Sequence, residues 1–165
     1  MFKTPILFIA FNRLDTASKV FEVIAKQKPE KLFFAVDAPR NEAEQEKCNL
    51  VKSLVKNISW QCDIKTFFPE RNLGPRLAVS SAVTWFFNQV ESGIILEHDC
   101  LPDESFFRFC EELLIFYKDS PKIMHITGNN FAVHKDLNDG YSYFFSSIPS
   151  IWGWATLRLA WKNYD

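Results

Sequence analysis

Short apolar runs alternate with amphipathic segments along most of the chain. The uninterrupted runs at residues 6–11 and 32–36 are typical of strands that are covered on both faces. Residues 63–68 and 94–96 predict a third and a fourth strand. Shorter runs at residues 123–126 and 143–145 predict two more strands near the end of the chain.

The segments between these runs have the spacing of helices. Asp15, Asn41 and Asp103 stand at helix starts and are residues that cap helices, and Glu44 follows Asn41 at capping-box spacing. A further helix is expected at residues 76–91 and a short one at 156–162. The expected inner faces consist of Ala17, Val20, Phe21, Ile24 and Ala25; Cys48, Val51, Leu54 and Val55; Val79, Ala82, Val83, Phe86, Phe87 and Val90; and Phe106, Cys110, Leu113, Leu114 and Tyr117.

Four strand–helix units in succession predict an α/β fold in three layers, with a mostly parallel sheet between helices. Such sheets bind their ligands at the carboxyl ends of the strands. The residues just after strands one, two and four are therefore expected on one rim. These residues are Asn12 and Arg13, Asp37, and Glu97, His98 and Asp99.

Composition and charge limit the classes of protein to which this chain could belong. The 165 residues suit a single domain, and 17 Phe and 5 Trp predict an aromatic-rich core or binding surface. A net charge of -1 argues against a broad nucleic-acid or anionic-membrane surface. The four cysteines lack metal or disulfide spacing, and we find neither a signal segment nor a transmembrane stretch. We therefore expect a cytoplasmic protein.

The sequence lacks the glycine-rich motifs that bind phosphate, but it has two acids just after the fourth predicted strand. No G-x-G-x-x-G follows the first strand, and no P-loop occurs, which makes an NAD-linked oxidoreductase a distant alternative. A metal ion that bridges a diphosphate is the natural substitute. Mg²⁺ or Mn²⁺ prefers one or two carboxylates together with phosphate oxygens and water. Glu97 and Asp99 fit that description.

The acidic stretch GIILEHDCLPDESFFRFC, residues 93–110, resembles the acidic-motif region of GT-A glycosyltransferases. The resemblance is closest to bacterial family-2-like enzymes, some of them described as hemolysin-like, and to the N-acetylglucosaminyltransferase I group. Three other stretches are similar to that family in the same order: PILFIAFNR (5–13), RNLGPRLAVSSAVTWFF (71–87) and IWGWATLRLAWKNYD (151–165). The resemblance implies a Rossmann-like nucleotide-diphospho-sugar transferase fold.

The same resemblance implies a role for each matching residue. Asp99 is expected to bind the Mn²⁺ or Mg²⁺, with Glu97 assisting or contacting the ribose. The nucleotide-sugar donor is expected to lie near Asn12, Arg13, Asp37, Arg71, Asn72, Gly74, Arg76, His98, Gly153 and Trp154. Within that set, Asp37 would contact the base, and Gly153 and Trp154 would line the sugar or acceptor side. The residues near the ribose or diphosphate would be Arg71, Asn72, Gly74 and Arg76. The acceptor would be a saccharide or a lipid-linked molecule.

Two departures from the family pattern stand out. His98 occupies the middle of the acidic triplet, where the family usually has an acid, and this puts the metal preference in question. The family's catalytic base follows the Gly-Trp segment. Residues 1–165 are thus expected to be one nucleotide-sugar-binding domain without the C-terminal acceptor and base part. The catalytic residue stays unassigned, with Asp139 and Asp165 as local candidates.

Each of these residues also has a purely structural interpretation. Glu97, Asp99 and Asp37 are common residues in turns after strands, and the arginines near Gly74 suit a solvated loop. Trp152, Trp154 and Trp161 would be either core residues or a platform for an acceptor. At the level of the whole protein, two alternatives to a glycosyltransferase remain. One is a non-catalytic nucleotide- or carbohydrate-binding module, and the other is an interaction domain with an aromatic tail from Tyr141 onward, with homo-oligomers left open.

Overall fold

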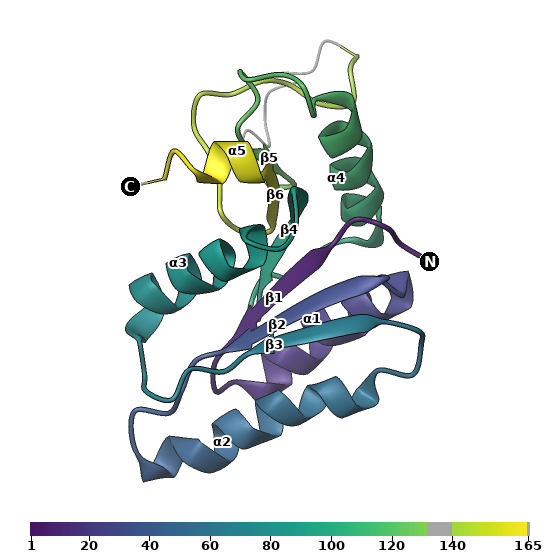
Figure 1. The fold of residues 1–165 in the computed structure, drawn as a ribbon. Coiled ribbons are helices and arrows are strands. Elements are labelled where there is room, and N and C mark those ends of the chain that lie inside the picture. Colours follow the sequence, from purple (N-terminus) through teal and green to yellow (C-terminus); the bar gives the residue numbers. More distant parts are fainter. Residues whose placement is uncertain (132–139, 165) are drawn as a thin grey trace.

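The computed structural model describes residues 1–131 and 140–164 as a three-layer α/β/α fold (Figure 1). Its strands are β1 (Ile6–Ala10), β2 (Lys31–Val36), β3 (Asp63–Phe67), β4 (Ser92–Glu97), β5 (Ile126–Thr127) and β6 (Trp154–Leu157). Its helices are α1 (Leu14–Gln27), α2 (Glu42–Lys52), α3 (Gly74–Phe87), α4 (Glu104–Phe116) and α5 (Arg158–Trp161), with a 3-10 turn, η1 (Ser53–Asn57), after α2. The predicted fold class is confirmed.

The six strands form one sheet in the order β3-β2-β1-β4-β6-β5. The first four run parallel, with β1 between β2 and β4, and β6 is antiparallel to both β4 and β5. Because β1, β2 and β4 are parallel neighbours, their carboxyl ends open on the same rim. The predicted gathering of the segments after these three strands is therefore confirmed.

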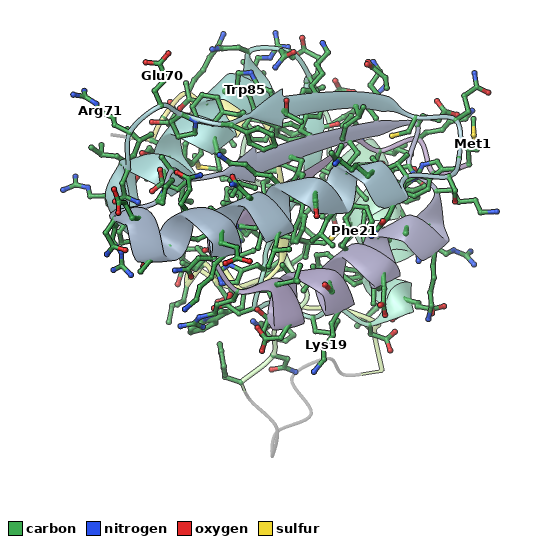
Figure 2. The ribbon with its side chains drawn as sticks, turned by 90° about the horizontal axis from the view of Figure 1, so that it is seen from below. Met1, Lys19, Phe21, Glu70, Arg71 and Trp85 are labelled. Atoms are coloured by element: carbon green, nitrogen blue, oxygen red, sulfur yellow. The ribbon has the colours of Figure 1, made fainter. Side chains whose placement is uncertain are left out.

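A separate apolar core lies on each face of the sheet. One core is formed with α1, α2 and α4 and contains Phe8, Phe21, Phe34 and Phe107. The other is formed with α3 and contains Phe33, Phe86 and Phe87. Figure 2 shows Phe21 pointing inward from α1, whereas Glu70 and Arg71 project outward on the side opposite Met1. The abundance of Phe is thus explained mainly by the two cores.

Some predicted elements differ from those of the structure. Helix α1 begins at Leu14, and its N-cap residue is Arg13, which makes no side-chain cap; Asp15 lies in the first turn. The short strand expected at 123–126 is displaced to β5, and residues 143–145 form no strand. Tyr143 and Phe145 instead pack against Tyr117 at the end of α4. These aromatic side chains are covered by contacts with another ring and not by a sheet. The apolar pattern alone does not distinguish these two kinds of burial.

Gly93 shows how closely α3 approaches the sheet. A Cβ atom at this position would lie 2.3 Å from Cζ of Phe86 and 2.8 Å from the carbonyl oxygen of Pro5. Only glycine allows that approach, so the start of β4 is fixed between β1 and α3. Among the described residues, no helix is long and apolar enough to cross a membrane.

Candidate functional site

The acidic triplet forms a tight turn at the carboxyl end of β4. The Cys100 N–H donates to the carbonyl oxygen of Glu97 at 3.0 Å, which closes the turn around His98 and Asp99. Glu97 is the last residue of the strand and is half-buried, whereas the side chain of Asp99 is 50% exposed. The two carboxylates therefore stand at the rim, one at the sheet and one beside solvent.

Burial and mutual repulsion make this turn unfavourable for negative charge. Burial, and then the nearby charge of Asp99, raise the pKa of Glu97 above its ordinary value. Burial lowers the pKa of His98, so its imidazole is neutral at neutral pH. Burial and the two carboxylates raise the pKa of Cys100 to about 11, which keeps its thiol protonated and unreactive. A bound cation would relieve the repulsion between the acids.

Arg13 brings a positive charge to the same place. It follows β1, the strand beside β4, and its Nη1 lies 3.9 Å from Oδ2 of Asp99. Both side chains are at least half exposed, so this ion pair adds little to stability. Arg13 is free to change partners, and the structure brings it together with the acidic turn as predicted.

Asn12 is held by Glu44, a buried acid that the sequence predicts only as part of a helix cap. Its Nδ2 donates to Oε1 of Glu44 at 3.1 Å. Glu44 also accepts from the backbone N–H of Arg40 at 3.0 Å and pairs with the Arg40 guanidinium, which lies over the ring of Phe11. These bonds hold the pKa of Glu44 down to about 2. Arg40 precedes α2 and stands four residues before Glu44, and this spacing of opposite charges is the sequence signal that could have predicted the ion pair.

Asp37 fixes the loop before α3. Its carboxylate accepts from the N–H groups of Leu73 at 3.0 Å and Gly74 at 3.1 Å, and from Nδ2 of Asn72 at 3.0 Å. It also accepts from the N–H of Ala38. A carboxylate of the chain itself thus occupies the amino end of α3, close to where the resemblance implies the ribose or diphosphate. Gly74 has a φ of +75°, which favours glycine at this bend.

The two arginines of this region differ from Asn72 and Gly74 in their exposure. Arg71 points into solvent from the loop after β3 (Figure 2). Arg76 is also exposed and lines a shallow groove along the first turns of α3 together with Leu77, Ser80 and Tyr164. Within the part of the chain that the structure describes, neither arginine forms a hydrogen bond or ion pair with the acidic turn.

The Gly-Trp segment enters β6 at the same rim. Gly153 has a φ of +75°, and a Cβ there would lie 3.4 Å from Cδ2 of Leu96. Trp154 is buried, and its ring stacks on His125 with centroids 4.9 Å apart. Trp161 packs against Trp154 and Phe87, whereas Trp152 is exposed. Trp154 thus supports the core at the rim rather than standing in the open.

The donor set suits an open cation site. Among residues 1–131 and 140–164, no group of three or more His, Cys, Asp or Glu side chains gathers in a way that could hold a metal ion. Glu97 and Asp99 supply two carboxylates, and Mg²⁺ or Mn²⁺ bound with a diphosphate uses one or two. The residues present fit a cation that is completed by phosphate oxygens. Asp139 and Asp165 lie outside the described residues.

Comparisons with known proteins give a fold but no family. No family model matches the chain, and no curated protein matches it. A solved structure, the 4-diphosphocytidyl-2C-methyl-D-erythritol synthase of Anaerococcus prevotii, is similar with a TM-score of 0.55 at 9% sequence identity. The match covers 98% of this chain and 75% of that one. The chain therefore shares its α/β fold with that synthase.

Proposed function

We propose that this chain binds a nucleotide-diphosphate sugar at the rim of β1, β2 and β4 and transfers the sugar to an acceptor with the help of a divalent cation. One observation carries the proposal. Two carboxylates, Glu97 and Asp99, stand at the end of a central strand, and the positive charge of Arg13 lies beside Asp99. The similar fold of a synthase whose name describes a diphosphocytidyl compound is in keeping with a nucleotide ligand.

Asp99 and Glu97 would hold Mn²⁺ or Mg²⁺ in this account. The cation, when bound, would neutralise charge on the leaving diphosphate. Arg13 would turn from Asp99 toward the phosphate oxygens, because the ion pair that now holds it is long and exposed. Arginine is well suited to phosphate oxygens because its planar guanidinium donates two parallel hydrogen bonds.

The remaining donor residues would work at different distances from the ligand. Asn12, fixed by Glu44, would border the nucleotide from the side of β1. Asp37, Asn72 and Gly74 would shape the wall of the site, since their polar groups already bond to one another. The resemblance places Arg71, Arg76 and His98 near the nucleotide-sugar donor, and we propose the same role for them here. Gly153 and Trp154 would line the sugar or acceptor side.

A non-catalytic binding module is the second candidate. Inverting transfer needs a carboxylate base for the acceptor hydroxyl. The two buried acids at the rim, Asp37 and Glu44, are engaged by the protein and do not suit that task. A module of this kind would bind the donor in the same place without turnover.

Release of nucleoside diphosphate separates these two functions. The chain would be incubated with UDP-, GDP-, CDP- and dTDP-linked sugars, Mn²⁺ and a mixture of saccharide acceptors, and the free nucleoside diphosphate measured. A transferase releases it, and Asp99→Asn lowers the rate by about 100-fold or more, as expected for a lost electrostatic contribution to the transition state.

Asp119→Asn is the matched control, because Asp119 is an exposed acid at the end of α4. Release at the wild-type rate by Asp99→Asn would refute the assignment of the acidic turn. Binding of a nucleotide sugar without release under all these conditions would favour the non-catalytic module.

A further inference from the structure

We propose that Phe131 and Trp152 form a saccharide-binding platform beside the acidic turn. The two rings contact each other edge to face with centroids 5.3 Å apart, yet their residues are 70% and 58% exposed. The platform would serve as the acceptor site of the proposed function. Its role as an acceptor site rests on that function, whereas saccharide binding itself does not.

The platform lies on the rim of the proposed donor site. Trp154 pairs with Ile95 in the antiparallel ladder between β6 and β4. Gly153 precedes Trp154 and comes close to Leu96, since a Cβ atom there would lie 3.4 Å from Cδ2 of Leu96. Trp152 comes just before it, at the end of β6 that borders the carboxyl end of β4. The other side of β4 faces β1 and Arg13. The rim thus has an aromatic side and a basic side, with the acidic turn between them.

Hydrogen bonds hold the platform in position. The Asn129 Nδ2 donates to the carbonyl oxygen of Trp152 at 3.1 Å, and the Gly128 N–H reaches the carbonyl oxygen of Gly153. The His125 Nε2 lies 2.7 Å from the carbonyl oxygen of Ser150. These contacts tie the segment before β6 to the segment around β5, so the backbone that carries Trp152 is ordered in advance. Preorganisation of this kind lowers the entropic cost of binding.

The surroundings distinguish this pair from the other tryptophans. Trp154 and Trp161 are packed into the core on the α3 face, and Trp60 donates its indole N–H to the carbonyl oxygen of Pro29. Trp152 shares the rim with the polar side chains of Asn129 and Ser150. Exposed rings bordered by amide and hydroxyl groups suit a sugar, whose ring has an apolar face and a hydroxyl edge. Exposed apolar surface bordered by polar groups is also characteristic of binding sites in general.

The test measures saccharide binding without nucleotide or metal. Binding of maltotetraose, cellotetraose, chitotetraose and mannotetraose would be followed by calorimetry up to millimolar concentrations. We expect at least one to bind the wild type, and Trp152→Ala and Phe131→Ala to weaken it by about tenfold, which is the size of one aromatic contact. Trp152→Phe should retain most of the affinity because it keeps a ring.

Phe116→Ala is the matched control, since Phe116 is 74% exposed at the far end of α4. It should bind as the wild type does, and circular dichroism would verify that each variant is folded. Failure of all four saccharides to bind, or equal binding by Trp152→Ala, would overturn the proposal. The proposal would also be overturned if no saccharide binds and the wild type forms a concentration-dependent dimer that the Trp152→Ala variant does not form. A response to nucleotide sugar and Mn²⁺ that is unchanged in Asp99→Ala, together with intact saccharide binding, would overturn the proposed function alone.

Discussion

The acids of the rim are of two kinds at the scale of single residues. Asp37 and Glu44 are buried and accept hydrogen bonds from amides or from Arg40. Burial and the charge of Asp99 make ionisation of Glu97 unfavourable, and Asp99 itself forms a long, exposed ion pair with Arg13 at 3.9 Å. Acids of the first kind stabilise the fold, whereas acids of the second kind are the ones to which the proposed function assigns the cation. Strained groups of the second kind concentrate at functional sites.

Glu97→Gln is expected to stabilise the protein in the absence of metal. The folded state raises the pKa of Glu97, so the charged form is less favourable in the folded chain than in the unfolded chain. This penalty grows as the pH rises from the unfolded pKa to the folded pKa, and it is complete above the folded pKa. Removing the charge should therefore increase the free energy of unfolding, measured with urea at neutral pH in a chelator. A less stable variant would contradict the strain assigned to this side chain.

The Glu44 network has the opposite dependence on pH. Its folded pKa is about 2, against an ordinary value of 4.5, so its contribution to stability is present above pH 4.5 and is lost as the pH falls toward 2. Wild type and Glu44→Gln should therefore differ in free energy of unfolding at pH 6 and converge in acid. Urea titrations at a series of pH values would measure this, and a gap independent of pH would refute the assigned role.

Asp37 matters at the scale of elements because it joins β2 to the start of α3. The carboxylate stands in for a phosphate at the amino end of that helix and shapes the loop from Asn72 to Gly74. The loop is therefore formed before any ligand binds. The region that the resemblance assigns to the ribose and diphosphate owes its shape to a single buried side chain.

Asp37→Ala should destabilise the chain by about 3 kcal/mol, because it leaves several N–H donors without their charged acceptor. Urea unfolding would measure the loss, and the helical signal in circular dichroism would show whether α3 persists. Asp63→Ala, at the exposed start of β3, serves as the control and should change stability by less than about 0.5 kcal/mol. Equal effects of the two substitutions would show that the loop does not depend on Asp37.

The local sequence pattern predicted the helices and strands well, but it did not predict how they pack against one another. Apolar runs identified β1, β2 and β4, and the caps at Asn41 and Asp103 are confirmed by bonds to the N–H groups of Glu44 and Ser105. The position of β6 beside β4 depends on contacts between distant parts of the chain, which periodicity does not contain. For the same reason the bonds from Asp37 to residues 72–74 and from Asn12 to Glu44 were not foreseen.

The whole molecule arranges its chemistry across one edge of the sheet. From β2 to β6, this edge carries the Asp37 loop, the Arg13 side chain, the acidic turn and the exposed Trp152. In the proposed reaction the nucleotide would lie over β1 and β2, the diphosphate at the end of β4, and the acceptor toward β6. The sugar would be transferred from the diphosphate to the acceptor.

The most direct test of the central claim is the thermal unfolding midpoint with a nucleoside diphosphate, with and without Mn²⁺. Ligand at about 100 times its dissociation constant stabilises by about 2.7 kcal/mol, which raises the midpoint of a domain of this size by about 5–10 °C. We predict such a shift for the wild type and for Asp119→Ala, and only when Mn²⁺ is present. Asp99→Ala should show no shift, and a shift of equal size in that variant would contradict a cation held by the acidic turn.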